Sequence, residues 1–517
     1  MRLYLKFAVA MAVTAITAET VSADRYVVDT GSPRQSISHF GASDAWAFPR
    51  IGAWPDEQQE QIADWLFSLE TDDKGNPLGI GLSLWRFNLG AGSYEQGDSS
   101  MIRWERRTEC MLRPDGTWDY TKQMPQRHFL KLAKERGVPY FLAFLNSAPV
   151  QFTDNGLATN YGRGGSINLR DDCYDDFADY MAKSLKAIET HDGIRFNYIS
   201  PVNEPDINWL DTLQEGSAAT NREIGRLVKE LDKALDRHRL STEIIVMEVS
   251  NLKNLIGRNE HTPFAQGYAL QQLFTPDSAA YIGNLRHVPG LIVGHSYWTN
   301  TPVTFMASLR RLIRQKCNSL GVGFWQSEYC IMDNDEEIGR GPKFDFTMTT
   351  ALYVARLIHH DLVMADARSW SWWRGAGEDY KNGLLRIYSN DTKRTGWAVD
   401  SKLLWSLGNF SRFIRPGAVR HEIVRYDESG AIVADGDTEP YGIMCSAYRN
   451  TDGSWVVVAI NYSEEVKPFH IEVPGMDGHK WTMYRTSDIA SENLAKTGTV
   501  DRDTRLAPRS VSTFVMK

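Results

Sequence analysis

Cysteine is scarce in this sequence, and its spacing excludes the sites that paired cysteines build. The 517 residues contain five cysteines and no Cys-x-x-C pair, so we expect neither a zinc site nor a dithiol redox site. The odd count leaves at least one thiol unpaired. Two interpretations stay open: a disulfide between Cys110 and Cys173, which both lie in polar, loop-like sequence, or five free thiols in a well-packed chain.

Concentrated charge is lacking as well. The chain has 57 basic and 65 acidic residues, a net charge of −8, and both signs are spread along it. Because there is no basic cluster, we predict no nucleic acid partner. Beyond the N-terminus no apolar run is long enough to span a bilayer, so we predict no membrane span. We expect a monomer that uses no cofactor and no metal.

The first 23 residues, MRLYLKFAVAMAVTAITAETVSA, have the pattern of a signal peptide. Arg2 and Lys6 precede an apolar stretch, which ends in Val-Ser-Ala before Asp24. This stretch is short for a membrane anchor, and no cysteine follows the cleavage site to carry a lipid. We expect cleavage after residue 23 and a soluble protein that is secreted or periplasmic.

Residues 37–415 repeat one pattern eight times. Apolar runs rich in β-branched and aromatic residues alternate with amphipathic stretches of helical period. The eight runs are 37–46, 79–90, 139–149, 194–205, 242–251, 290–298, 322–330 and 367–375. Eight strand–helix units in a row predict an α/β fold, a (β/α)₈ TIM barrel, rather than an open sheet.

The pattern changes after residue 415. Residues 416–517 contain short strands separated by turn residues and no helical stretch, which predicts an antiparallel β-sandwich domain. The segment 24–36 has strand character, and we expect it to join the sandwich. No Ser- or Pro-rich linker separates the two domains, so we expect them to pack rigidly.

Two glutamates end strands of the predicted barrel. Glu204 lies in SPVNEPDINW at the end of the fourth run, and Glu328 lies in GFWQSEYC at the end of the seventh. Their separation equals about three strand–helix units, and the carboxyl ends of barrel strands form one mouth, so both side chains should face it. Two carboxylates across one cleft are the equipment of glycoside hydrolysis.

The same segments carry a family resemblance. With VNEP and SEY as a pair, and FSRFIRPGAVR leading into the β domain, the chain resembles glycoside hydrolase family 30 almost end to end. Within that family it is most similar to endo-β-1,6-galactanases, on FGASDAW, RRTECMLRPDGTWDY, SPVNEP and LQEGSAATNREI. The resemblance implies a retaining enzyme, whose two carboxyl groups should lie about 5 to 5.5 Å apart.

The chemistry and the resemblance together give roles to five residues. Glu328 is the expected nucleophile, and Glu204 is the expected acid/base, with a pKa raised by the Glu328 charge. Arg86 should lie beside Glu328 and keep it ionised, and Tyr297 could donate a hydrogen bond to it. Asn203 should bond the sugar 2-hydroxyl, an interaction that strengthens in the transition state.

The expected wall of the site comes from the remaining strand ends. We expect it to contain Asp44, Trp46, Asn146, His295 and Trp373. Asp44 is the candidate partner of an axial 4-hydroxyl, and the two tryptophans are candidate stacking floors, because flat apolar sugar faces pack on aromatic rings.

Other residues near strand ends are not assigned to the site. Glu215 in QEG is equally consistent with binding a neighbouring sugar and with a structural role, and Glu248 is expected to be structural. Simpler assignments are expected for a further group: a core role for Trp370 and Trp372, the surface for His359 and His360, and a solvated loop for Asp333, Asn334 and Asp335.

The sequence favours one substrate class and leaves others open. The closer resemblance predicts cleavage of β-1,6-galactosidic bonds in galactan side chains of the arabinogalactan type. A β-1,6-glucanase or another β-glycanase of the same family is the alternative, since galactose and glucose differ only at the 4-hydroxyl, which loops contact. A glycan-binding protein without activity is less favoured, because both carboxylates and Arg86 are present. Endo and exo action both stay open.

Overall fold

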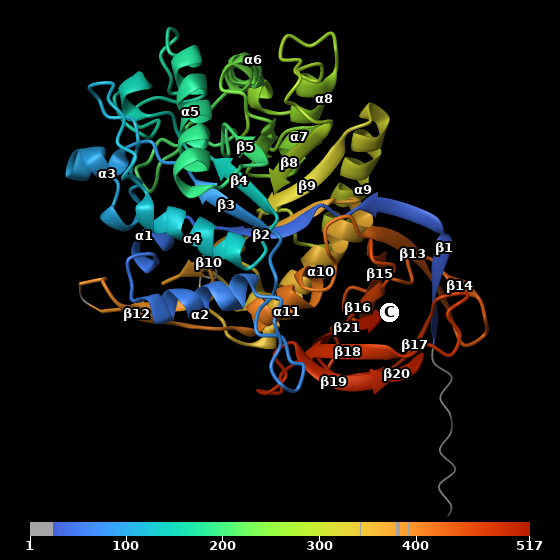
Figure 1. Ribbon diagram of the computed structural model, residues 1–517. Helices are drawn as coiled ribbons and strands as arrows, with labels where there is room; N and C mark the ends of the chain where they lie inside the picture. Colours follow the sequence, from blue (N-terminus) through green and yellow to red (C-terminus); the bar gives the residue numbers. More distant parts are fainter. Residues whose placement is uncertain (1–23, 342, 379–382, 391) are drawn as a thin grey trace, which may run out of the picture.

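The computed structural model describes residues 24–341, 343–378, 383–390 and 392–517. The predicted signal peptide, residues 1–23, lies outside the described residues. Figure 1 shows a helix-covered barrel packed against a smaller domain of strands, so the predicted barrel with a C-terminal β-sandwich is confirmed. Among the described residues there is no helix whose length and apolar character would let it cross a membrane.

The barrel is a closed sheet of parallel strands. It closes because the first strand, β2, pairs with both β3 and β10. The fifth strand is split at Ile245 into β6, which pairs with β5, and β7, which pairs with β8. In chain order the strands are β2 (His39–Ser43), β3 (Leu84–Asn88), β4 (Tyr140–Phe144), β5 (Tyr198–Ser200), β6 (Glu243–Ile244), β7 (Val246–Val249), β8 (Leu291–His295), β9 (Gly323–Glu328) and β10 (Ser369–Gly377).

Helices follow the barrel strands and bury one apolar side against them. The helix at Asn221–Arg237 shows the local cause, because a reciprocal capping box between Thr220 and Glu223 fixes its start. The helices are α1 (Phe48–Ile51), α2 (Asp56–Phe67), α3 (Ser93–Gln96), α4 (Met124–Glu135), α5 (Tyr174–Asp192), α6 (Asn221–Arg237), α7 (Lys253–Ile256), α8 (Ala269–Phe274), α9 (Val303–Leu320), α10 (Met348–Met364) and α11 (Lys402–Ser411).

Two further strands, missed in the sequence, extend the sheet beyond the last barrel strand. They are β11 (Gly383–Ser389), parallel to β10, and β12 (Gly396–Val399), antiparallel to β11. The sequence pattern did not reveal them because they interrupt the eighth strand–helix unit before α11. Figure 1 shows β12 at the left, away from the sandwich.

The second domain is one curled sheet whose faces enclose their own core. Its strands run in the order β19-β18-β21-β16-β15-β13-β1-β17-β20, and β14 pairs with β13. Most pairs are antiparallel, but β1 and β17 are parallel, which departs from the predicted antiparallel sandwich. The strands are β1 (Arg25–Ser36), β13 (Val419–Tyr426), β14 (Ile432–Val433), β15 (Ile443–Arg449), β16 (Trp455–Asn461), β17 (Lys467–Glu472), β18 (Trp481–Thr486), β19 (Ala495–Val500), β20 (Asp503–Leu506) and β21 (Ser510–Met516).

The two domains share a continuous apolar interface. Buried residues of β15, β16 and β21 belong to the same apolar cluster as the barrel core. On α11, the Asn409 side chain donates to Thr513 and accepts from Thr486. The domain interface also covers α10. His359 and His360 are fully buried in this helix, and His359 bonds Thr438 of the sandwich domain, so the prediction that both histidines lie on the surface is wrong.

All five cysteines are free and buried. Cys110 lies 3.4 Å from the Tyr180 hydroxyl, and Cys173 contacts the Arg170 guanidinium. Of the two open interpretations, the structure therefore shows free thiols and not the Cys110–Cys173 disulfide. The fold depends on packing rather than on cross-links.

Candidate active site

Two strand ends deliver the predicted catalytic carboxylates to one place. Glu328 is the last residue of β9, as predicted. The fourth strand instead ends at Ser200, before Pro201, so Glu204 sits in the turn that follows rather than at the strand's last position. Its backbone has φ +47°, a left-handed conformation, and its N–H donates to the Glu248 carbonyl at 2.8 Å. Such strain in a non-glycine residue is typical of functional sites.

Glu328 is held by two of the predicted partners. The Arg86 guanidinium donates to one of its oxygens at 2.8 Å, and the Tyr297 hydroxyl donates to the other at 2.9 Å. Arg86 is fully buried, and it also stacks on the Phe144 ring with 4.3 Å to the ring centroid. A buried cation at hydrogen-bonding distance favours the ionised form of a carboxylate, which is the form a nucleophile needs.

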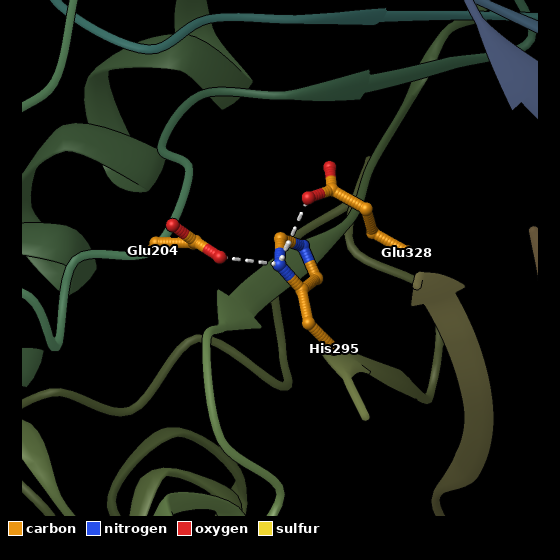
Figure 2. A group of neighbouring side chains, drawn as sticks. All are labelled: Glu204, His295 and Glu328. Atoms are coloured by element: carbon orange, nitrogen blue, oxygen red, sulfur yellow. Dashed lines mark hydrogen bonds and ion pairs between the residues drawn. The ribbon is translucent and has the colours of Figure 1, made fainter. Parts of the chain in front are cut away.

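His295 lies between the two carboxylates, as Figure 2 shows. Its Nδ1 is 3.0 Å from an oxygen of Glu204 and 3.4 Å from an oxygen of Glu328. Its Nε2 is 3.0 Å from Glu248, so both ring nitrogens face carboxylates. The sequence predicted His295 only as part of the wall, whereas the structure places it at the centre.

Glu248 contacts His295 on the side away from Glu204 and has no exposed surface. Its carboxylate contacts His295, the Arg86 guanidinium at 3.4 Å and the Ser327 hydroxyl. Burial alone would raise the pKa of Glu248, but the charges of Arg86 and His295 outweigh burial and lower it to about 2. The expected structural role of Glu248 therefore takes the form of a buried anion between two cations.

Burial and the surrounding charges set the protonation of Glu204, the predicted acid/base. Burial is the main cause that raises the pKa of Glu204 to about 7, with the Glu328 charge adding to it and His295 opposing it. The expected direction is therefore found, but burial rather than Glu328 is the largest cause. For His295, burial favours the neutral ring, yet the carboxylates of Glu328, Glu204 and Glu248 outweigh it and raise the pKa to about 10.

The central group also has the composition of a metal site. Glu204, His295 and Glu328 each offer one ligand atom, and these atoms lie within 4.8 Å of one another. In the structure both nitrogens of His295 contact carboxylates, Nδ1 that of Glu204 and Nε2 that of Glu248. The structure shows these three side chains as an ion-paired group.

Two asparagines present buried amide oxygens. Asn203 and Asn146 are nearly fully buried, and the side-chain oxygen of each has no hydrogen-bond partner among the described residues. Buried polar atoms are rarely left unsatisfied, and a ligand commonly supplies the missing donor. Sugar hydroxyls are donors of this kind, so the predicted contacts of Asn203 and Asn146 with substrate stay predictions with a physical basis.

The predicted stacking residues differ from each other. Trp46 is almost buried, and the guanidinium groups of Arg106 and Arg374 lie 4.2 and 5.0 Å from its ring centroid. These contacts argue against the prediction that Trp46 is an open stacking floor. Trp373 meets Trp46 edge-on at 5.5 Å and lies next to Arg86, so it stays a predicted floor beside the nucleophile.

The predicted contact of Asp44 with sugar is wrong, and the open assignment of Glu215 resolves to its structural alternative. Asp44 is 0% exposed, accepts hydrogen bonds from the Asn88 N–H and the Gln126 side chain, and has a pKa that burial raises to about 7. Glu215 is likewise buried and bonds Ser93 and nearby backbone. The hydrogen bonds of each side chain hold a neighbouring loop in place.

Other assignments are mixed. Trp370 and Trp372 are fully buried, as predicted for core residues. Asp333 is buried and accepts a hydrogen bond from the Tyr329 hydroxyl at 2.8 Å, which corrects the prediction that it belongs to a solvated loop. Trp298 was not among the predicted site residues. Its ring lies 5.6 Å from the Tyr297 ring, and the residue is 46% exposed, so it is a further candidate for sugar stacking. Its position directly after Tyr297 was the available signal.

Comparison with known proteins agrees with this geometry. Residues 23–386 match O-Glycosyl hydrolase family 30, and residues 431–514 match the Glycosyl hydrolase family 30 beta sandwich domain. An endo-beta-1,6-galactanase of Hypocrea rufa is 28% identical over 194 residues, 34% of this chain and 39% of that enzyme. An exo-beta-1,6-galactobiohydrolase of Bifidobacterium longum is 25% identical over 182 residues, 34% of this chain and 12% of that enzyme.

The alignments span less than half the length of these curated relatives, whereas one solved structure is similar throughout. A conserved exported protein from Bacteroides fragilis is 35% identical, with a TM-score of 0.87, and the match covers 95% of this chain and 99% of that one. The matched family region covers well over half of the chain and contains both glutamates, so the chain belongs to glycoside hydrolase family 30.

Proposed function

We propose that the protein is a retaining glycoside hydrolase in which Glu328 is the nucleophile and Glu204 is the acid/base. The observation that carries this proposal is the spacing of the pair: an oxygen of Glu204 and an oxygen of Glu328 lie within 4.8 Å of each other. Inverting enzymes separate their carboxyl groups by about 6.5 to 9.5 Å to admit a water, whereas retaining enzymes need about 5 to 5.5 Å.

The chemistry is a double displacement. In the first step a Glu328 oxygen forms a bond to the anomeric carbon, the glycosidic bond breaks, and the Glu204 proton passes to the leaving oxygen. In the second step water attacks the anomeric carbon, its proton passes to Glu204, and the ester bond to Glu328 breaks. Arg86 and Tyr297 orient the Glu328 carboxylate for attack, since each donates to one of its two oxygens.

The proposed substrate is a β-1,6-linked galactan, such as the side chains of arabinogalactan. Support comes from the names of two curated relatives, an endo-beta-1,6-galactanase and an exo-beta-1,6-galactobiohydrolase, and from the resemblance of the loop segments FGASDAW and QEGSAATN to such enzymes. A 1,6-link adds a rotatable bond, so the enzyme must hold several sugars to position one scissile bond. With Asp44 buried, the residue that reads the 4-hydroxyl lies elsewhere.

Product analysis tests both parts of the proposal. The purified protein is incubated with β-1,6-, β-1,4- and β-1,3-linked galactans and with β-1,6-glucan, and the anomer of the first product is followed by proton NMR. We expect β-1,6-galactan to be cut fastest and the β-anomer to appear first. Equal turnover of β-1,6-glucan would overturn the substrate, and a first product of α-configuration would overturn the retaining mechanism.

Export is a separate proposal. It is supported by the charged, apolar and small-residue pattern of residues 1–23. Mass spectrometry of protein recovered from the medium or the periplasm should show Asp24 at the N-terminus. Recovery of the chain only inside cells, with residues 1–23 intact, would contradict it.

A further inference from the structure

The position of His295 raises a question about charge during turnover. Its Nδ1 lies 3.0 Å from Glu204, at hydrogen-bonding distance, and 3.4 Å from Glu328, where the contact is an ion pair, so one ring nitrogen lies close to both carboxylates (Figure 2). A hydrogen bond from one N–H is strong toward one acceptor at a time, and it is strongest toward the acceptor that carries charge.

The negative charge moves between these two carboxylates in a double displacement. Before the first step Glu328 is ionised and Glu204 holds a proton. In the glycosyl-enzyme intermediate Glu328 is a neutral ester, and Glu204 has become the carboxylate that later accepts a proton from water. The pair keeps one negative charge throughout, but that charge changes residue halfway through the cycle.

We propose that Glu248 and His295 form a positioning relay, in which Glu248 anchors a cationic His295 so that its Nδ1–H donates to whichever of Glu328 and Glu204 is charged. This relay rests on the proposed retaining function and adds two residues that do not bond the anomeric carbon. His295 keeps its two protons throughout, so only its hydrogen-bond partner changes. The cation lowers the energy of each charge state in turn, without any movement of the barrel strands.

Glu248 is built to be the anchor. Its side chain bonds the far nitrogen of His295 at 3.0 Å, and its backbone carbonyl accepts the Glu204 N–H at 2.8 Å. Arg86 and Ser327 bond the same carboxylate and fix it in turn. One residue thus sets the orientation of the histidine and the backbone position of the acid/base.

The groups that face His295 are consistent with a permanent cation. Carboxylates approach it from three strand ends, through Glu204 after β5, Glu248 in β7 and Glu328 in β9. From its own strand end the Tyr297 ring packs edge-on against it at 5.7 Å. Arg86 of β3 reaches Glu248 and Glu328 rather than the histidine. The carboxylates prevail, and they raise the pKa of His295.

Glu248→Gln is the sharpest perturbation, because glutamine keeps the shape and an oxygen acceptor for His295 while the charge is removed. The substrates are the 4-nitrophenyl glycosides of β-1,6-galactobiose and β-1,6-glucobiose, whose good leaving group needs little acid assistance, so that hydrolysis of the intermediate limits kcat. We expect kcat to fall by about 10- to 100-fold, the contribution of one hydrogen bond to a charged group, with a smaller change in kcat/KM. A burst of nitrophenol should precede the steady state.

The same variant should change the pH profile. Loss of the Glu248 charge weakens the hold of His295 on its proton, and a neutral His295 no longer lowers the pKa of Glu204. Glu204 then keeps its proton to higher pH, so the alkaline limb of kcat/KM on the natural polysaccharide should move to higher pH. Glu215→Gln is the matched control: it neutralises another buried glutamate of the barrel, and it should lower stability without moving that limb.

Three results separate the possible failures. Wild-type protein that cleaves neither glycoside would overturn the proposed function and the relay with it. Active wild type with an unchanged kcat and pH profile in Glu248→Gln would overturn the relay alone. If that variant does not fold, ¹⁵N NMR of histidine-labelled wild type decides, with His295→Gln for assignment: both ring nitrogens protonated at pH 8 supports the relay, and a neutral ring overturns it.

Discussion

The raised pKa of Glu204 makes a prediction about stability as well as catalysis. Glu204 has an ordinary value of 4.5 and a folded value of about 7, so the folded protein holds this proton at pH values where the unfolded chain has already released it. The contribution of Glu204 to stability is therefore fully favourable below about pH 4.5 and is lost progressively as the pH rises through 7. Ionisation of Glu204, the proposed acid, should therefore lower the stability of the fold in alkaline solution.

The size of the effect follows from the two pKa values. A difference of one pKa unit corresponds to about 1.4 kcal/mol, so ionised Glu204 should cost about 3 kcal/mol of unfolding free energy at pH 8 and almost nothing at pH 4. Glu204→Gln removes the titration and leaves an oxygen that can accept from His295. We expect this inactive variant to be more stable than wild type by about 3 kcal/mol at pH 8 and equal to it at pH 4.

Urea unfolding, followed by tryptophan fluorescence at pH 4 and pH 8, measures the difference directly. Glu57→Gln, in the exposed first turn of α2, is the control for removal of one acidic group from the surface. A Glu204→Gln variant with the same stability gain, or none, at both pH values would show that the folded protein does not hold this proton. Glu204 would then be the wrong choice for the acid.

Four other outcomes are expected. Glu328→Ala should lower kcat by about 10⁴- to 10⁶-fold with an unchanged circular dichroism spectrum, and an active variant would exclude Glu328 as nucleophile. Trp298→Ala should raise KM about tenfold at nearly constant kcat, since its exposed ring can stack on a sugar without touching the carboxylates; an unchanged KM would place substrate elsewhere. Dithiothreitol should leave the melting temperature unchanged, because the cysteines are free, and a drop would reveal a disulfide. Deletion of 416–517 should give insoluble protein, because it exposes the apolar interface on α10 and α11, and a soluble, active barrel would contradict this.

The fold was predictable because the barrel repeats one signal eight times. Each run of β-branched and aromatic residues marks a strand, and each amphipathic stretch marks a helix, so a single ambiguous unit does not change the architecture. The short strands β11 and β12 were missed because they interrupt that repeat. His359 and His360 were misplaced for a related reason: helical period shows which side of α10 is polar, but not that a second domain covers it.

The candidate site was predictable where position alone determines contact. Residues at the ends of barrel strands meet at one mouth, so the neighbours of Glu328 could be named from their strands. Asp44 follows a strand in the same way, yet its two oxygens accept hydrogen bonds from the Asn88 N–H and the Gln126 side chain. Whether a strand-end carboxylate faces substrate or fastens a loop depends on local hydrogen bonds, and the strand pattern does not contain them.

The charges at the centre explain why the acid is the residue that titrates. Glu248 and Glu328 are the anions of the group, and Arg86 and His295 are its cations, so the cluster is balanced as long as Glu204 keeps its proton. Ionisation of Glu204 adds a negative charge to a buried, already neutral group, which is costly in a medium of low dielectric. In the proposed mechanism the first chemical step removes the charge of Glu328 as Glu204 loses its proton, so the net charge of the group does not change. Ionisation of Glu204 therefore costs more free energy while Glu328 is charged than after Glu328 has bonded to the sugar. This difference couples proton release from Glu204 to the attack of Glu328.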